Sequence, residues 1–298
     1  MQMLKSFARA VLPEPVLRPL RSAWRLASGA PSVAPAEPAG PPDWEAVADT
    51  DAVWQAGQGW SHESIVARQT EGWQAFLQGI AEGRPAYVAV PDDPSVPVDV
   101  AVHNTLMVFI YLLGRVASEA QAGRPSVLDW GGGIGQHYRF ARAFYPGVDW
   151  DYVIREVPGL AAAGAVRNPE ASFVTSDDAA LARRYSAVYA SASIMYARNL
   201  YASLGRLCDA AVRYLLVTRT PFVLEHDDFV VVQRPRRYGY DTEYAGWFLN
   251  LPKFRRFVES RGFVLDREFP LAERPFVANA PEQCRYRALL FRRVGHAA

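Results

Sequence analysis

The chain has 298 residues, of which 50% are hydrophobic and 21% charged, and its 32 basic and 31 acidic side chains leave a formal net charge of +1. This length and apolar content suffice for a substantial core, and the near-neutral charge is not typical of a nucleic-acid-binding protein. The two cysteines, Cys208 and Cys284, are too few for a disulfide framework, and the five histidines show no metal-ligand spacing. We therefore expect no structural metal and a reducing, cytoplasmic location.

Residues 1–28 are predicted to form a pair of short, basic amphipathic helices in which five Lys and Arg side chains accompany one acid, Glu14. No apolar stretch among them is long enough for a signal peptide or a membrane span. Two interpretations stay open: a peripheral contact with the inner face of a membrane, or docking on the protein's own body. Residues 29–43 are dense in Pro and Ala and are expected to form an extended linker.

Residues 44–103 are predicted to form a helical cap over the core, which is expected to span residues 104–298. Trp60 and His62 in the cap are candidates for ligand contact, although aromatic residues at such spacing usually belong to a hydrophobic core. The apolar run 106–113 is too short to cross a bilayer, so it is interpreted as a buried helix.

The most informative stretch is 127–135, in which an apolar strand ends in Asp129 and continues into Gly131, Gly132, Gly133 and Gly135. Glycines allow the positive φ of a tight turn and leave room for a ligand against the backbone. The helix predicted over 136–145 then presents free N–H groups to an anion. The third glycine of the dinucleotide motif G-x-G-x-x-G is missing, and no Lys-Ser/Thr pair completes a P-loop. The stretch thus indicates a different nucleoside-containing cofactor.

Further strands follow the glycines in alternation with helices. The strand predicted over 148–156 ends at Glu156, 21 residues after Gly135, where an acid can accept hydrogen bonds from a ribose diol. Strands over 171–175, 186–190 and 213–218 follow, with helices over 160–165 and 200–211 between them. A helix over 251–261 and strands over 263–269 and 285–293 end the series. Such alternation predicts a parallel sheet with right-handed crossovers.

This order of elements over about residues 104–294, with an acid before G-G-G-x-G, resembles the class I methyltransferases that use S-adenosylmethionine. More narrowly, the runs D-W-G-G-G-I-G-Q-H-Y, V-I-R-E-V-P and Y-A-S-A-S-I-M-Y are similar to a little-characterised family of methyltransferases associated with bacterial surface-polysaccharide genes. The resemblance implies an α/β fold with a Rossmann-like sheet, mostly parallel with one antiparallel strand, and an N-terminal helical extension.

The resemblance also implies S-adenosylmethionine as the cofactor. The loop of Gly131, Gly132, Gly133 and Gly135 would pass under the methionine part, and Asp129 would face the ammonium end directly or through water. Glu156 would hold the ribose, Asp177 would lie beside the adenine amino group, and Ser191 would complete the cofactor site.

Methyl transfer to a hydroxyl needs a base, and His137 and His226 are the candidates. His137 opens the helix after the glycines, where the positive end of the helix dipole disfavours imidazolium, and His226 has acidic neighbours. The candidate acceptor-binding residues are Ser193, Tyr196, Tyr238 and Tyr240. The two last tyrosines lie among arginines, a combination that suits a sugar bearing phosphate or carboxylate.

The sequence favours a methyltransferase that O-methylates a saccharide or related small acceptor in cell-envelope glycan biosynthesis. The alternative is a non-catalytic accessory protein of a glycan-assembly complex that binds S-adenosylmethionine or a nucleotide. A nucleotide-sugar oxidoreductase is disfavoured by the missing third glycine. We expect a small-molecule or glycan partner and no nucleic-acid partner. The sequence contains no indication of oligomeric state.

Overall fold

The computed structural model describes residues 41–55, 59–84, 100–120 and 123–295. The predictions for residues 1–28 and for nearly all of the linker lie outside these ranges. Residues from Pro42 onward belong to one compact unit, so the described part of segment 44–103 shares that unit with the core. None of the helices in the described ranges is long and apolar enough to cross a bilayer.

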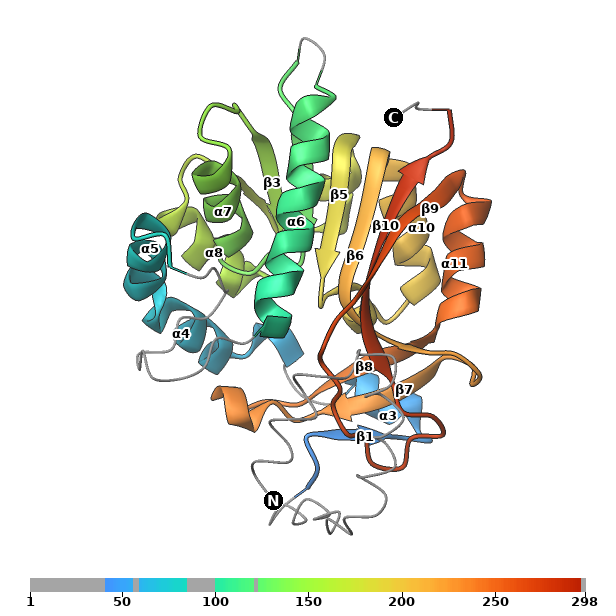
Figure 1. Ribbon diagram of the computed structural model, residues 1–298. Coiled ribbons are helices and arrows are strands. Elements are labelled where there is room, and N and C mark those ends of the chain that lie inside the picture. The colour runs from blue at the N-terminus through green and yellow to red at the C-terminus, as the bar shows by residue number, and fades with distance from the viewer. Residues whose placement is uncertain (1–40, 56–58, 85–99, 121–122, 296–298) are drawn as a thin grey trace, which may run out of the picture. The chain divides into compact units, whose positions relative to one another are not determined.

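A mostly parallel sheet forms the centre of this unit, with strand order β4-β3-β2-β5-β6-β10-β9 (Figure 1). Its strands are β2 (Ser126–Trp130), β3 (Asp151–Arg155), β4 (Ser172–Val174), β5 (Tyr185–Ser191), β6 (Ala211–Val223), β9 (Phe263–Pro270) and β10 (Arg285–Arg293). Strands β2 to β6 pair in parallel, whereas β10 is antiparallel to both of its neighbours. This is the strand order of the class I methyltransferase fold, so the predicted Rossmann-like sheet with one antiparallel strand is confirmed.

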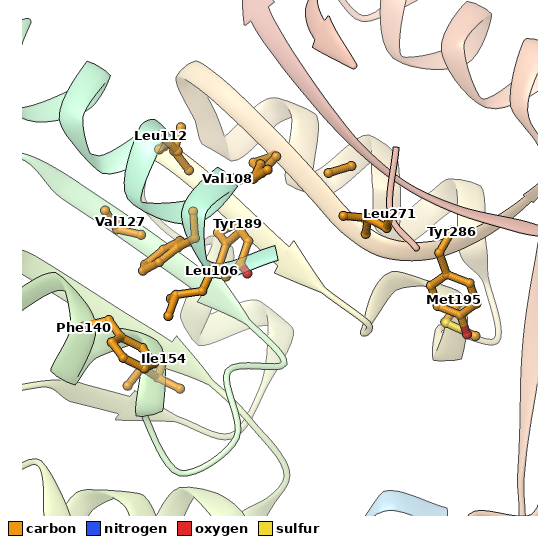
Figure 2. Close-up of a cluster of buried hydrophobic side chains, with 14 of the residues drawn as sticks. Leu106, Val108, Leu112, Val127, Phe140, Ile154, Tyr189, Met195, Leu271 and Tyr286 are labelled. Atoms are coloured by element: carbon orange, nitrogen blue, oxygen red, sulfur yellow. The ribbon is translucent and has the colours of Figure 1, made fainter. Parts of the chain in front are cut away.

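Side chains that alternate along the strands enter two separate hydrophobic clusters, one on each face of the sheet. On β2, Val127 belongs to the cluster under α6 (Val100–Ser118), α7 (Gln136–Phe144) and α8 (Pro158–Arg167), part of which Figure 2 shows. Leu128 belongs to the opposite cluster, under α9 (Asp177–Leu181), α10 (Leu200–Ala210) and α11 (Leu251–Ser260). Burial of a side chain such as Phe109 on α6 contributes about 1.5–3 kcal/mol.

Helix α6 is longer than the apolar run 106–113 that predicted it. Leu106, Phe109 and Leu113 repeat at helical spacing and are fully or almost fully buried against the sheet. Because the helix starts at Val100, the boundary expected between 103 and 104 falls inside it. Residues 100–103 of the predicted cap therefore share one helix with the start of the predicted core.

A second, antiparallel sheet lies beyond the end of β6 and consists of β1 (Trp44–Ala46), β7 (Phe229–Gln233) and β8 (Tyr244–Asn250). Strand β8 pairs in parallel with Phe222 and Val223 at the end of β6. Figure 1 shows this sheet below the central one. The helical prediction is wrong for Trp44–Ala46, because these residues complete the edge of a sheet whose other strands lie far along the chain.

The remaining described elements of the cap are helical, as predicted: α3 (Thr50–Gln55), η1 (Gly59–Ser61), α4 (Glu63–Glu71) and α5 (Trp73–Ala81). His62 caps α4, because its Nδ1 accepts a hydrogen bond from the backbone N–H of Ser64 at 3.2 Å. Two further short helices, η2 (Ile194–Tyr196) and η3 (Arg236–Tyr238), follow β5 and β7.

Candidate functional site

A cavity of about 510 Å³ lies at the carboxyl ends of the central parallel strands. One part of its lining comes from the loops that follow β2, β3 and β5 and from Arg219 of β6. Another part comes from η1, α4, α5 and the start of α6. In open α/β sheets this edge is where ligands bind. The cavity therefore lies where the sequence predicts the cofactor.

The glycine loop after β2 is packed too tightly for side chains. Gly131 has φ 79°, and a Cβ there would lie 2.4 Å from the Cβ of Ser193. A Cβ on Gly132 would lie 2.6 Å from the Cγ of Asp129. Three of the four predicted glycines, Gly131, Gly132 and Gly133, line the cavity. Gly135 does not line it and instead serves as the left-handed N-cap of α7, with φ 92°.

Glu156 lies directly after β3, is 6% exposed and lines the cavity. Its Oε2 accepts a hydrogen bond from the backbone N–H of Gly133 at 2.8 Å, and its Oε1 accepts one from the N–H of Val157 at 2.7 Å. Burial raises the pKa of Glu156, and the two backbone N–H groups oppose that rise. Since a carboxylate has about four acceptor sites, it can still accept hydrogen bonds from a ligand hydroxyl.

Asp129 is fully buried and lies beneath the glycine loop, outside the lining of the cavity. Its Oδ2 accepts a hydrogen bond from the Tyr152 hydroxyl at 3.0 Å, and its Oδ1 has no hydrogen-bond partner in the described ranges. Burial raises the pKa of the Tyr152 hydroxyl well above its usual value, and the charge of Asp129 adds to the rise. Asp129 thus supports the loop from below, and the expected contact with the ammonium end of the cofactor, directly or through water, stays a prediction.

His137 lines the cavity and is 8% exposed. Its Nδ1 lies 3.5 Å from Oδ2 of Asp129, and its Nε2 lies 3.3 Å from the Tyr189 hydroxyl. The ring also packs against Phe109 with centroids 5.0 Å apart. The imidazole therefore borders the cavity with a carboxylate beside Nδ1 and a hydroxyl beside Nε2, two partners that fix its orientation.

Asp177 begins α9 and is not among the lining residues. Its Oδ1 accepts a hydrogen bond from the Trp130 indole N–H at 2.9 Å and forms an ion pair with Arg155 at 2.7 Å. Trp130 and Arg155 both line the cavity, and the Arg155 guanidinium lies 5.3 Å from the Trp130 ring centroid. Asp177 accordingly holds two side chains of the cavity wall.

The end of β5 supplies Ser191, and the segment after it supplies Ser193 and Tyr196, all of which line the cavity. The Ser193 hydroxyl donates a hydrogen bond to the carbonyl of Trp130 at 2.7 Å, which joins this segment to the glycine loop. Tyr196 donates to Oε1 of Gln233 at 2.6 Å, and burial raises the pKa of its hydroxyl. Tyr196 is thus held in its neutral form.

Tyr238 and Tyr240 line the cavity together with Trp60 of η1. The Trp60 ring packs edge-to-face with Tyr196 and Tyr240, with centroids 5.2 and 6.3 Å apart, and stacks on Tyr244 at 4.8 Å. Within the described part of the chain, the buried Nε1 of Trp60 has no hydrogen-bond acceptor. These rings form one aromatic wall of the cavity.

His226 lies outside the cavity, in the exposed turn between β6 and β7. Its Nδ1 lies 2.9 Å from the carbonyl oxygen of Asp227, and its backbone N–H donates to Oε2 of Glu282. His226 has acidic neighbours in the sequence, as predicted, but its ring does not lie with the other predicted site residues at the cavity. Of the two histidines, only His137 lies at the cavity.

Several lining residues were missed from the sequence: Arg68, Gln69, Arg155 and Arg219. Arg155 directly precedes Glu156, so its place at a strand end was a usable signal. Gln69 lies over the glycine loop, since a Cβ on Gly133 would be 3.0 Å from its Oε1. Nothing in the sequence near Arg68 or Arg219 indicates a cavity. Among the described residues no cluster of three metal-ligating side chains occurs.

No family model matches the sequence, and no curated protein matches it. Solved structures do resemble the fold. Magnesium protoporphyrin IX methyltransferase from Synechocystis PCC 6803, with bound S-adenosylmethionine, is 13% identical with a TM-score of 0.47, over 78% of this chain and 97% of that one. A Burkholderia thailandensis 1,6-didemethyltoxoflavin-N1-methyltransferase, with bound S-adenosylhomocysteine, is 12% identical with a TM-score of 0.43, over 78% and 88%. Mitomycin 7-O-methyltransferase is 16% identical with a TM-score of 0.41, over 82% and 71%. These likenesses concern the fold alone.

Proposed function

We propose that the protein is an S-adenosylmethionine-dependent methyltransferase. The observation that carries this proposal is the position of Glu156, a buried carboxylate that lines the cavity and is hydrogen-bonded to the glycine loop of the neighbouring strand. An acid there accepts hydrogen bonds from a ribose diol, while the adjacent backbone without side chains admits the rest of a nucleoside ligand.

The residues present fit this cofactor. Gly131, Gly132 and Gly133 would lie under its amino-acid end, and Glu156 would bind the ribose. Trp130 and Arg155, both held by Asp177, and Ser191 at the end of β5 border the same space. Asp129 would act from beneath the loop, by keeping Gly132 and His137 in position. In this proposal Asp177 supports the adenine side through the two side chains that it holds.

When bound, the cofactor supplies a methyl group on a sulfonium, and the protein has to align the acceptor atom with it. For a hydroxyl acceptor, a base must also take up the proton. His137 is the candidate for that role because it borders the cavity and is oriented by Asp129. The acceptor would pack against the aromatic wall of Trp60, Tyr196, Tyr238 and Tyr240, next to Ser193.

An aromatic wall of this kind suits a saccharide ring, since sugars pack their apolar faces on aromatic rings. Together with the sequence resemblance to methyltransferases of surface-polysaccharide genes, it supports O-methylation of a saccharide or related small acceptor in cell-envelope glycan biosynthesis. The basic segment 1–28 would bring the enzyme to the inner face of the membrane.

Thermal unfolding with added ligands tests the cofactor. S-Adenosylmethionine or S-adenosylhomocysteine is expected to raise the unfolding midpoint of the purified protein, and NAD is not, because a ligand stabilises only the state that binds it. Equal stabilisation by NAD would contradict the proposal. Mass spectrometry of cell-envelope glycans incubated with the protein and labelled cofactor then distinguishes an enzyme from a non-catalytic binder.

A further inference from the structure

Arg219 occupies an unusual position in β6. Thr218 and Arg219 stand opposite a single residue of β10, Ala288, since Val217 pairs with Leu289 and Thr220 pairs with Arg287. This is a β-bulge, and Arg219 has φ 49° in it, a left-handed conformation that glycine adopts at much lower cost. Bulges next to active sites redirect a side chain, and the strain at such sites is retained where function requires it.

The redirected side chain is held on one side only. Arg219 donates a hydrogen bond from Nε to Oε1 of Glu273 at 2.8 Å, and its Nη2 forms an ion pair with the same oxygen at 2.7 Å. Its Nη1 has no hydrogen-bond partner in the part of the chain that the structure describes. The side chain is 31% exposed and lines the cavity. A guanidinium fixed by a carboxylate at one edge keeps donors for a second anion at the other edge.

Arg219 lies on the side of the cavity away from the predicted ribose site. Glu156 follows β3, whereas Arg219 belongs to β6, three strands further along the sheet in the order β3-β2-β5-β6. With a strand spacing of about 4.8 Å, that separation is about 14 Å. Arg219 lines the same cavity as Tyr196 and Tyr240 of the aromatic wall. A second left-handed residue, Ala192 with φ 48°, lines the cavity next to it.

We propose that Arg219 binds a carboxylate or phosphate group of the acceptor, which makes the acceptor an anionic ring compound such as an acidic or phosphorylated sugar. This inference rests on the proposed function, because it takes the β6 side of the cavity as the acceptor side. The aromatic wall holds the ring by packing, and Arg219 selects for its charge.

Calorimetric titration tests the proposal with three probes: glucuronate, glucose 6-phosphate and glucose, each added to protein saturated with S-adenosylhomocysteine. At least one of the two anions is expected to bind at least about tenfold more tightly than glucose, in line with a charge-assisted hydrogen-bonded pair. The tighter of the two anions identifies the group as carboxylate or phosphate. Binding of neither anion at high millimolar concentration, or equal binding of glucose, overturns the proposal.

The matched variants are Arg219→Gln and Arg261→Gln. Arg261 also pairs with an acid, Asp209, but does not line the cavity. Arg219→Gln is expected to weaken anion binding at least about tenfold and leave the affinity for S-adenosylhomocysteine unchanged, whereas Arg261→Gln changes neither. If Arg219→Gln weakens S-adenosylhomocysteine as strongly as the anion, Arg219 binds the cofactor carboxylate and the proposal is wrong.

Removal of Arg219 alone leaves the largely buried carboxylate of Glu273 without its partner, and that variant can fail to fold. The double variant Arg219→Gln with Glu273→Gln removes both charges, so its anion affinity can still be compared with that of the wild type. Arg219→Lys keeps the positive charge but lacks the planar set of N–H donors of a guanidinium. Arg219→Lys is expected to retain part of the anion affinity and the double variant none. Should the wild-type protein bind no S-adenosylhomocysteine, the proposed function fails, while the anion titrations in its absence still test Arg219.

Discussion

The Oε2 atom of Glu156 accepts a hydrogen bond of 2.8 Å from the backbone N–H of Gly133. This bond joins the end of β3 to the loop after β2, so the carboxylate that would bind a ribose also holds the glycine loop in place. Glu156 also lines the cavity, so its carboxylate lies where it can accept further hydrogen bonds from a ligand.

Replacement of the carboxylate should weaken cofactor binding. Glu156→Ala removes the acceptor for the ribose hydroxyls and leaves the N–H groups of Gly133 and Val157 without their partner. We expect the Kd for S-adenosylmethionine to rise at least about tenfold, as measured by isothermal titration calorimetry. Glu259→Ala on α11, which removes a glutamate paired with Arg255, is the control and should bind like wild type. Unchanged affinity of Glu156→Ala would exclude Glu156 from the site.

The pH dependence of cofactor binding should report the same carboxylate. Burial raises the pKa of Glu156 in the folded protein above its pKa in the unfolded chain. The protonated Glu156 therefore stabilises the fold at a pH below the unfolded-state pKa, and this stabilisation is lost as the pH rises through the folded-state pKa. Binding has the opposite sign, because ribose hydroxyls donate to the ionised form. The affinity for S-adenosylmethionine should therefore fall as the pH decreases through a value above that of an ordinary glutamate. Glu156→Gln should lack this step, and an identical pH profile in that variant would contradict the assignment.

A side chain in the glycine loop should destabilise the fold. The Cβ of Gly131→Ala would lie 2.4 Å from the Cβ of Ser193, and φ at this position is 79°. We expect a loss of about 1–3 kcal/mol in the free energy of unfolding, measured by urea denaturation. Gly147→Ala is the matched control, because a Cβ there meets nothing within 4 Å, and it should change stability little. Similar stabilities of the two variants would mean that the loop is not packed as described.

The two histidines should differ in their effect on turnover. His137→Ala removes the group that borders the cavity beside Asp129, and we expect methyl transfer to fall by about 10²–10⁴-fold. His226→Ala changes an exposed turn and should retain turnover. Labelled S-adenosylmethionine with cell-envelope glycans as acceptors measures both. Cofactor affinity is measured alongside, since a loss of binding in His137→Ala would assign His137 to the cofactor site and not to proton transfer. Full turnover of this variant would exclude it as the base.

Much of the fold could be predicted from local patterns. The glycine stretch and the acid 21 residues after Gly135 mark the ends of two parallel strands, and parallel strands bring their carboxyl ends to one edge. Strands alternating with helices then determine the kind of sheet. Trp44–Ala46 was predicted wrongly because its strand exists through pairing with β7 and with Ala278, both of which lie far along the chain. A strand of three residues has no periodicity of its own to detect.

The sequence by itself determined the edge of the sheet where the cofactor is proposed to bind, since backbone chemistry and strand-end spacing are local properties. Only the tertiary structure decided what surrounds that edge. It places Asp129 beneath the loop beside His137, leaves His226 on an exposed turn and brings Trp60 against Tyr240. It also forms the bulge that directs Arg219 to the cavity. These contacts join residues distant along the chain, so strand register and the packing of the cap decide them, and neither is encoded in a short motif.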